Sequence, residues 1–160
     1  MATVAWDGWD KIGTLLVQAG ADVSPAVAVV RRGVPTSVPK EMIRYWYLGT
    51  EDSPFAPGHT FSRTQVGIKL MVAVFLPMAG AGSPASEEAL DDRIELLDAA
   101  IQSALWSDTY LGNPDIGTNS AIGIEITGSD ADVVQVGTGW VRSLEIPVTY
   151  AIADRHTIAR

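Results

Sequence analysis

The chain has 160 residues, a formal net charge of -8 and no cysteine. This length fits one domain, residues 1–160, with a core of its own, and the missing thiols exclude disulfides, thiolate metal sites and cysteine nucleophiles. The acidic excess disfavours nonspecific binding to nucleic acid or to an anionic membrane. No basic region precedes an apolar run at the N-terminus, and the longest apolar run is far shorter than a membrane span. We therefore expect a soluble protein without a signal peptide.

The first part of the chain predicts one helix and one weaker strand. Residues 7–19 repeat apolar side chains at the spacing of an amphipathic helix, which Gly20 should end. Residues 26–30 are apolar but too few for periodicity to identify a buried strand. Residues 31–41 contain two prolines, which favours an extended surface connection.

A second strand and a long loop follow. Residues 43–48 alternate, with aromatic side chains on both faces, and predict a strand. The loop at 49–63 holds two prolines and two glycines, and its Phe55 and Phe61 have no local apolar partners. A loop this long in a compact domain is usually functional or disordered.

The rest of the chain is organised around a strand and a helix in residues 64–107. Residues 66–76 alternate strictly and give a strand one apolar side. After a Gly-rich break, Ser83 or Ser86 can cap a helix that holds Pro84 in its first turn. The helix keeps one apolar face, formed by Leu90, Ile94, Leu97, Ile101 and Leu105. A strand and a helix with one apolar side each should pack on each other.

The last part predicts further strands. Residues 122–126 alternate, and residues 133–136 should return beside them after a hairpin turn at 128–130. A second Gly-rich turn leads to a final strand at about 141–152. Pro147 lacks a sheet donor, so this strand should lie at an edge or be bulged there. The order of elements predicts an α+β fold, a mainly antiparallel sheet with two helices packed on one face.

A nucleotide site is the first candidate for chemistry. Gly80, Gly82 and Ala85 match G-x-G-x-x-A between a strand and a helix, where a pyrophosphate would bind the helix N-terminus. Pro84 interrupts this motif, and two glutamates open the helix where phosphate would dock. A flexible turn fits these residues better, and the chain has no P-loop motif.

The acidic face of the same helix is the second candidate. It consists of Glu88, Asp91, Asp92 and Glu95. A catalytic or metal-binding carboxylate pair would need imidazoles or a buried setting, which nothing here supplies. Two interpretations stay open: a solvated face, or an acidic wall that faces a DNA channel or a basic partner.

The histidines and arginines complete the candidates. His59 and His156 are the only histidines, one in the long loop and one near the C-terminus, which disfavours a triad or a histidine-based metal site. Residues 129–132 offer two of the ligand positions of a calcium loop. Arg31 and Arg32 could serve a subunit contact, because arginine is enriched in interfaces. We expect no catalytic residue, no cofactor and no metal.

Five features of the chain form one recognisable layout. They are a leading amphipathic helix, Arg31-Arg32-Gly33-Val34-Pro35, Val72-Ala73-Val74-Phe75, a helix through 90–105 continuing into Leu111-Gly112, and Leu144-Glu145-Ile146-Pro147-Val148-Thr149-Tyr150. This layout resembles that of the tail terminator proteins of long-tailed, siphovirus-like bacteriophages. The resemblance spans nearly the whole chain, and the loop at 49–63 departs from the family pattern.

The resemblance implies a structural protein without catalysis. Its subunits would form a ring, expected to be a hexamer, that caps the completed tail tube and meets the head-tail connector protein. Partners would be further copies and the major tail tube protein, with DNA passing through the channel without specific binding and no membrane contact. The protein would be assembled in the host cytoplasm and lie at the head-proximal end of the virion tail. Candidate subunit or tube contacts are Arg31, Arg32, Phe55, His59 and Phe61.

Two alternatives remain beside this interpretation. A neck or head-completion connector protein of a tailed phage would share the small α+β subunit and the ring. A nucleotide-binding enzyme that uses the turn at 80–85 is the more remote alternative.

Overall fold

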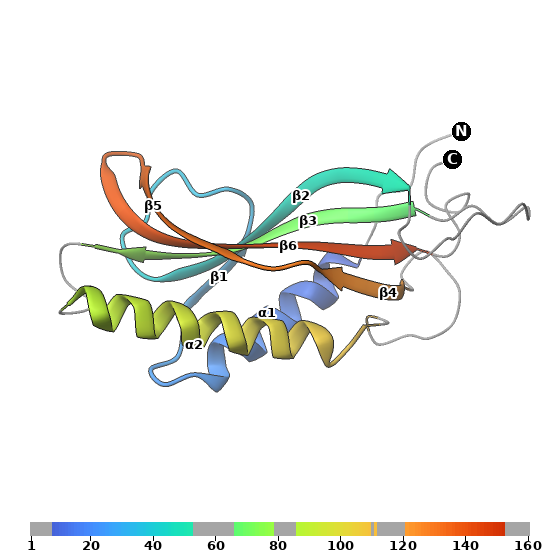
Figure 1. Ribbon diagram of the computed structural model, residues 1–160, viewed down its shortest axis with the longest axis horizontal. Coiled ribbons are helices and arrows are strands. Elements are labelled where there is room, and N and C mark those ends of the chain that lie inside the picture. Colours follow the sequence, from blue (N-terminus) through green and yellow to red (C-terminus); the bar gives the residue numbers. More distant parts are fainter. Residues whose placement is uncertain (1–7, 53–65, 79–85, 110, 112–120, 153–160) are drawn as a thin grey trace, which may run out of the picture.

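A computed structural model of the protein describes residues 8–52, 66–78, 86–109, 111 and 121–152. These residues form a six-stranded sheet with two helices on one face (Figure 1). Only β1 and β2 pair in parallel among the described strands, so the predicted α+β fold with a mainly antiparallel sheet is confirmed. The elements are α1 (Trp9–Asp22), β1 (Val29–Arg32), β2 (Met42–Asp52), β3 (Val66–Pro77), α2 (Glu87–Trp106), β4 (Ala121–Ile126), β5 (Asp130–Val136) and β6 (Gly139–Ile152).

The core lies between the helices and one face of β3 and β6. β3 pairs with β6 along its whole length, from Val66↔Ile152 to Pro77↔Val141. The predicted apolar stripe of α2 is buried against this sheet in full, at Leu90, Ile94, Leu97, Ile101 and Leu105. Burying one leucine side chain stabilises the fold by about 2 kcal/mol, so the stripe accounts for the docking of α2. Neither described helix is long and apolar enough to cross a membrane.

Ser86 caps α2, which decides between the two predicted caps. Its Oγ accepts a hydrogen bond from the Ala89 N–H at 3.1 Å. Because α2 begins at Glu87, the prediction that Pro84 lies in the first turn is wrong. Pro84 itself lies outside the described residues.

Helix α1 does not end at Gly20, as predicted, but continues to Asp22. The Gly20 carbonyl accepts a hydrogen bond from the Val27 N–H at 2.9 Å. A Cβ added to Gly20 would lie 3.2 Å from the Val27 Cβ. The glycine therefore permits the close return of the chain toward β1, which is a tertiary requirement.

Strand β2 extends past the predicted end at residue 48. Its ladder with β3 shifts register between Tyr47 and Gly49, where Gly49 has φ 130°, and then resumes as far as Asp52. The predicted loop at 49–63 thus begins too early, because this irregularity bends the strand without ending it. Residues 53–63 lie outside the described residues.

The predicted hairpin through residues 128–130 is wrong. Strands β4 and β5 both pair with β6, with Ile126↔Val148 and Asp130↔Glu145 as the pairs that flank the break. The intervening Ser129 donates a hydrogen bond from Oγ to Asp98 Oδ2 on α2 at 2.7 Å. The chain therefore leaves and rejoins the same edge. The second turn is confirmed, with Val136 opposite Gly139 and Gly137 at φ 61°.

The prediction that the final strand lies at an edge because of Pro147 is also wrong. β6 is an interior strand, flanked by β3 on one side and by β4 and β5 on the other. Pro147 lies opposite the break at 127–129, where neither β4 nor β5 pairs with β6. Its missing N–H therefore costs no bond to β4 or β5. The ladder with β3 runs through Pro147 without a register shift, so the alternative prediction of a bulge at this residue is not confirmed either.

Candidate functional site

The two ends of the sheet carry the features that could join one subunit to another. Strand β1 pairs only with β2, and strand β5 pairs only with β6, among the described strands. An outer strand presents N–H and C=O groups along its unpaired side, which another chain can use. The two ends lie on opposite sides of the β2–β3–β6 centre (Figure 1).

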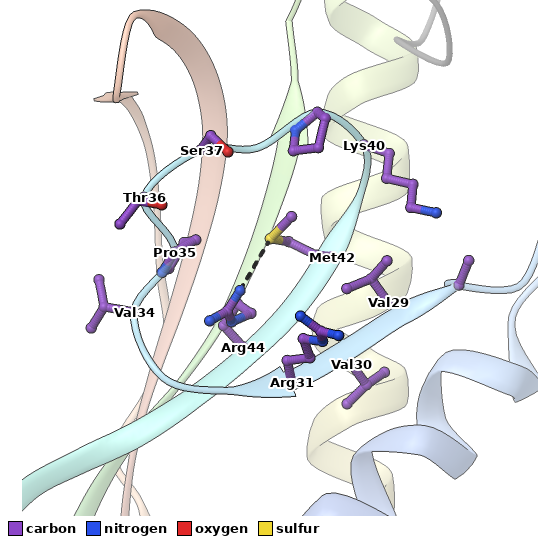
Figure 2. Close-up of a pocket in the computed structure, with 12 residues that line it drawn as sticks. Val29, Val30, Arg31, Val34, Pro35, Thr36, Ser37, Lys40, Met42 and Arg44 are labelled. Atoms are coloured by element: carbon purple, nitrogen blue, oxygen red, sulfur yellow. Dashed lines mark hydrogen bonds between the residues drawn. The ribbon is translucent and has the colours of Figure 1, made fainter.

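A cationic groove borders β1. It has a volume of about 590 Å³ and lies between β1, the start of β2 and the connection from Val34 to Lys40 (Figure 2). Arg31, Lys40 and Arg44 line it. Since Val29 and Met42 belong to the apolar cluster on the face away from the helices, the groove opens on that face.

Arg44 forms the floor of this groove and is fixed by its own chain. Its Nε donates to the Gly33 carbonyl at 2.8 Å, and its Nη2 donates to the Arg32 carbonyl at 3.4 Å. Burial, and then the neighbouring Arg31, lower the pKa of Arg44 below its usual value. The guanidinium stays charged, so two cations face each other across the β1–β2 ladder, and neither forms an ion pair with an acid of the described residues.

Arg32 points to the opposite face and already has an internal partner. Its guanidinium carbon lies 4.1 Å from the centre of the Trp9 ring, a cation–π contact. Trp9 also packs beside Tyr45 and Tyr47, with ring centres 6.2 and 6.3 Å away. Of the two arginines predicted as subunit contacts, Arg31 is therefore the one that is not engaged with an aromatic ring.

The β5 end of the sheet has the opposite charge. Asp130 and Asp132 are exposed and lie on the same face as the groove, because they pair with Glu145 and Ser143 of β6. Asp132 Oδ1 accepts a hydrogen bond from the Val133 N–H at 2.7 Å. Val133 is 40% exposed on the helix face. The sequence predicted Asp130 as part of a turn and Asp130 and Asp132 as two ligand positions of a calcium loop, and it predicted Val133 as the start of a strand.

The acidic stripe of α2 is solvent-exposed, as its spacing indicates, but it is not purely acidic. Glu88, Asp92 and Glu95 are exposed, and Asp91 accepts a hydrogen bond from Arg142 Nη2 at 2.7 Å. This geometry fits a solvated face with one surface ion pair.

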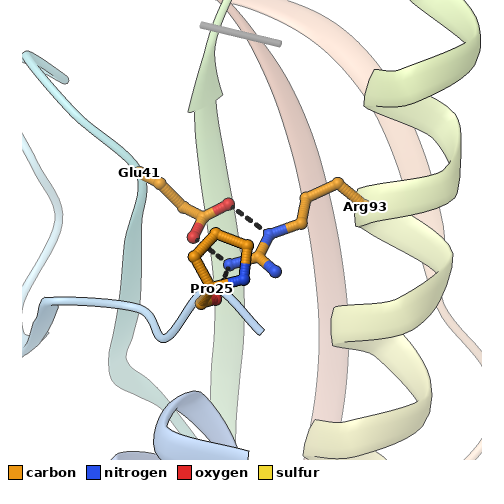
Figure 3. A network of polar contacts seen from close by, with 3 residues as sticks. All are labelled: Pro25, Glu41 and Arg93. Atoms are coloured by element: carbon orange, nitrogen blue, oxygen red, sulfur yellow. Dashed lines mark hydrogen bonds and ion pairs between the residues drawn. The ribbon is translucent and has the colours of Figure 1, made fainter. Parts of the chain in front are cut away.

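Arg93 stands within this acidic region and ties α2 to the chain entering the first strands. Its Nε and Nη2 donate to the two Glu41 carboxylate oxygens at 2.8 and 2.6 Å, and Nη2 also donates to the Pro25 carbonyl at 2.6 Å (Figure 3). The bond to Glu41 raises the pKa of Arg93 more than burial lowers it. The network is structural, since it joins three segments distant in sequence.

Several sequence candidates lie outside the described residues: Phe55, His59, Phe61, Gly80, Gly82, Ala85 and His156. Within the described residues, no group of three or more His, Cys, Asp or Glu side chains is placed to hold a metal ion. The sequence reasoning missed the acidic β5 end. Its signal was the acid at every second position in Asp130-Ala131-Asp132, which puts both carboxylates on one face of a strand.

Comparison with known proteins gives similarities to solved structures alone. No protein-family model matches the chain, and no curated protein is significantly similar to it. A solved structure described as an extracellular contractile injection system, PVC sheath/tube terminator in extended state, is similar with a TM-score of 0.43 and 11% identity. The match covers 96% of this chain and 58% of that chain. This chain thus spans little more than half of that protein, and at this identity the two need not share a function.

Proposed function

We propose that the protein is a tail terminator, a ring-forming structural protein that caps a completed tail tube of a bacteriophage. The observation that carries the proposal is the pair of unpaired sheet ends, cationic at β1 and acidic at β5. A subunit whose two sides differ and complement each other can associate head to tail, and such heterologous contacts form a ring when the rotation between neighbours closes. The resemblance of the chain to tail terminators supplies the identity of the ring.

Such a ring would end polymerisation by shape alone. One face of the ring would bind the last layer of the major tail tube protein, and the other face would bind the head-tail connector protein. Because the upper face is not a copy of a tube subunit, the tube could not grow further. The ring, expected to be a hexamer, would lie at the head-proximal end of the virion tail after assembly in the host cytoplasm.

The net charge of -8 suits a ring through which DNA passes without adhering. A channel wall that carries more acid than base gains nothing from counterion release when DNA enters it. The proposal therefore includes neither a DNA-binding activity nor a reaction.

The test is tube assembly in the presence of the purified protein. The cognate tube protein should form tubes that bear a ring density at one end, and substoichiometric amounts of this protein should shorten them. Electron microscopy of negatively stained tubes measures both. Tubes of normal length without end density, in an excess of the protein, would refute the terminator and favour a neck connector.

A further inference from the structure

We propose that β5 of one copy adds to β1 of the next copy as an antiparallel strand, in the register Val29–Val134, Val30–Val133 and Arg31–Asp132. The contact deepens the proposed ring and rests on it, since it names the surfaces that join neighbouring subunits. It would continue the sheet of one subunit into the sheet of the next.

The strand directions permit this pairing. β1 runs parallel to β2, β2 is antiparallel to β3, β3 to β6, and β6 to β5. Strands β1 and β5 therefore run in opposite directions within one sheet. A neighbour added beside β1 in the same orientation presents β5 antiparallel to it, which is the more stable arrangement per residue.

The backbone groups that face outward also agree with the register. The Gly33 N–H donates to the Tyr45 carbonyl on β2 at 2.8 Å, and N–H directions alternate along a strand. The N–H of Val30 therefore points to the unpaired side of β1. On β5, the Val133 N–H donates to Asp132 Oδ1. In a hairpin with a two-residue turn the closing pair, here Val136 and Gly139, exchanges backbone hydrogen bonds, and because N–H directions alternate from there, the Val133 N–H also points outward. Val30 and Val133 are thus placed to exchange both of their backbone hydrogen bonds.

Side chains match on the face away from the helices. Val29 and Val134 both pack against the small apolar cluster on that face, so their pairing extends one apolar row. Asp132 would come opposite Arg31, the cation that lies next to Arg44 across the β1–β2 ladder. A carboxylate there separates two like charges, and cross-strand pairs of opposite charge are favourable.

Side chains also match on the helix face. A hollow beside β1 is lined by Asp10, Gly13, Thr14, Val17, Val30 and Tyr45. Val17 is 54% exposed and Val133 is 40% exposed. In the proposed register, Val133 of the neighbour lies opposite Val30 and over this hollow, so the contact would cover apolar surface that both copies expose.

Asp132 has a different role in the free subunit and in the contact. In the free subunit its carboxylate accepts the hydrogen bond of the outward Val133 N–H, so that this donor is not available to the edge strand of an unrelated protein. In the contact the Val30 carbonyl takes this N–H, and the Asp132 carboxylate turns to Arg31. One side chain thereby protects the edge and selects a cationic partner.

Engineered cysteines test the register directly, since the chain has none of its own. Val29 and Val134 would form a pair without mutual backbone hydrogen bonds, with Cα atoms about 4.5 Å apart, which a disulfide can span. The Val29→Cys and Val134→Cys variants, mixed and oxidised with copper phenanthroline, should form a covalent dimer at least tenfold faster than either alone. Val29→Cys mixed with Val133→Cys is the matched control, because Val133 lies on the opposite face, and it should not cross-link.

Charge reversal tests the same contact without new cysteines. Arg31→Asp should weaken self-association about tenfold by sedimentation velocity, Asp132→Arg should do the same, and the double variant should recover most of the loss. Circular dichroism melting of each variant separates a lost contact from a lost fold.

Two outcomes separate this contact from the function it rests on. The protein could form rings and cap tubes while Val29 and Val134 fail to cross-link and the double charge reversal fails to restore self-association. That outcome would overturn the proposed strand contact but not the terminator function. A protein that stays monomeric alone and in the presence of tubes, without capping them, would overturn both.

Discussion

Removing the Glu41 carboxylate should destabilise the fold through Arg93. The Arg93 and Glu41 side chains are only 11% and 18% exposed, and the pair makes two charge-assisted hydrogen bonds at 2.8 and 2.6 Å. Exposed ion pairs contribute about 0.2–1 kcal/mol, whereas breaking a buried pair costs about 3–5 kcal/mol. This pair is mostly buried but still reached by solvent, which places it between those limits, so we expect Glu41→Ala to lower the free energy of unfolding by about 2 kcal/mol.

The expected loss corresponds to a fall in Tm of roughly 4–8 °C for a chain of this size. Urea unfolding followed by tryptophan fluorescence measures the free energy, with the slope m unchanged if the folded state is preserved. A double-mutant cycle with Arg93→Ala should return a coupling energy above about 1 kcal/mol, because the two side chains contact each other.

The Arg142–Asp91 pair supplies the matched control. It also has a 2.7 Å contact, but the Asp91 side chain is 67% exposed. Asp91→Ala should therefore cost less than about 0.5 kcal/mol, and 1 M salt should reduce that cost further. Equal losses for Glu41→Ala and Asp91→Ala would refute the reasoning, because burial would then not decide the strength of the pair.

Three further outcomes can be measured on the same protein. Leu97→Ala should lower the free energy of unfolding by about 2–5 kcal/mol in urea titrations, because Leu97 is fully buried on the inner face of α2. Leu96→Ala, at an exposed position of the same helix, should cost under about 0.5 kcal/mol. Gly137→Ala should lower the Tm, since Gly137 has φ 61° and a Cβ there would lie 2.8 Å from the Thr36 carbonyl oxygen; a Tm equal to that of the unmodified protein would contradict this. The unmodified protein should not shift DNA at low salt, whereas lysine at all four stripe positions should create salt-sensitive binding in the assembled ring; tight binding before substitution would rule out a non-adhesive channel. These positions are Glu88, Asp91, Asp92 and Glu95.

Local periodicity determined the parts of the fold that have one apolar side. The alternation in residues 66–76 and the stripe from Leu90 to Leu105 identified β3, α2 and the faces that they bury. A serine cap for α2, at Ser83 or Ser86, and the turn at Gly137 followed from residue chemistry within a few positions, and the structure selects Ser86. These features depend on neighbours in sequence, so the sequence alone is sufficient for them.

Pairing partners depended on the tertiary structure. The hairpin expected at 128–130 and the edge expected at Pro147 both failed for one reason: β6 is long enough to pair with β4 and β5 in turn and with β3 throughout. Gly20 has a similar explanation. Its missing side chain leaves room for Val27 to pack close by, and it does not end the helix.

The candidate interface also depended on which strands became outermost. Arg31 was singled out by residue type, but its groove exists only because Arg44 pairs beside it and the Val34 to Lys40 connection folds over both. The acidic pair on β5, Asp130 and Asp132, can serve an interface only because β5 is an outer strand at the opposite end of the sheet. A sequence specifies which side chains share a face through periods of two and 3.6, but long-range contacts alone decide which strand is left without a neighbour.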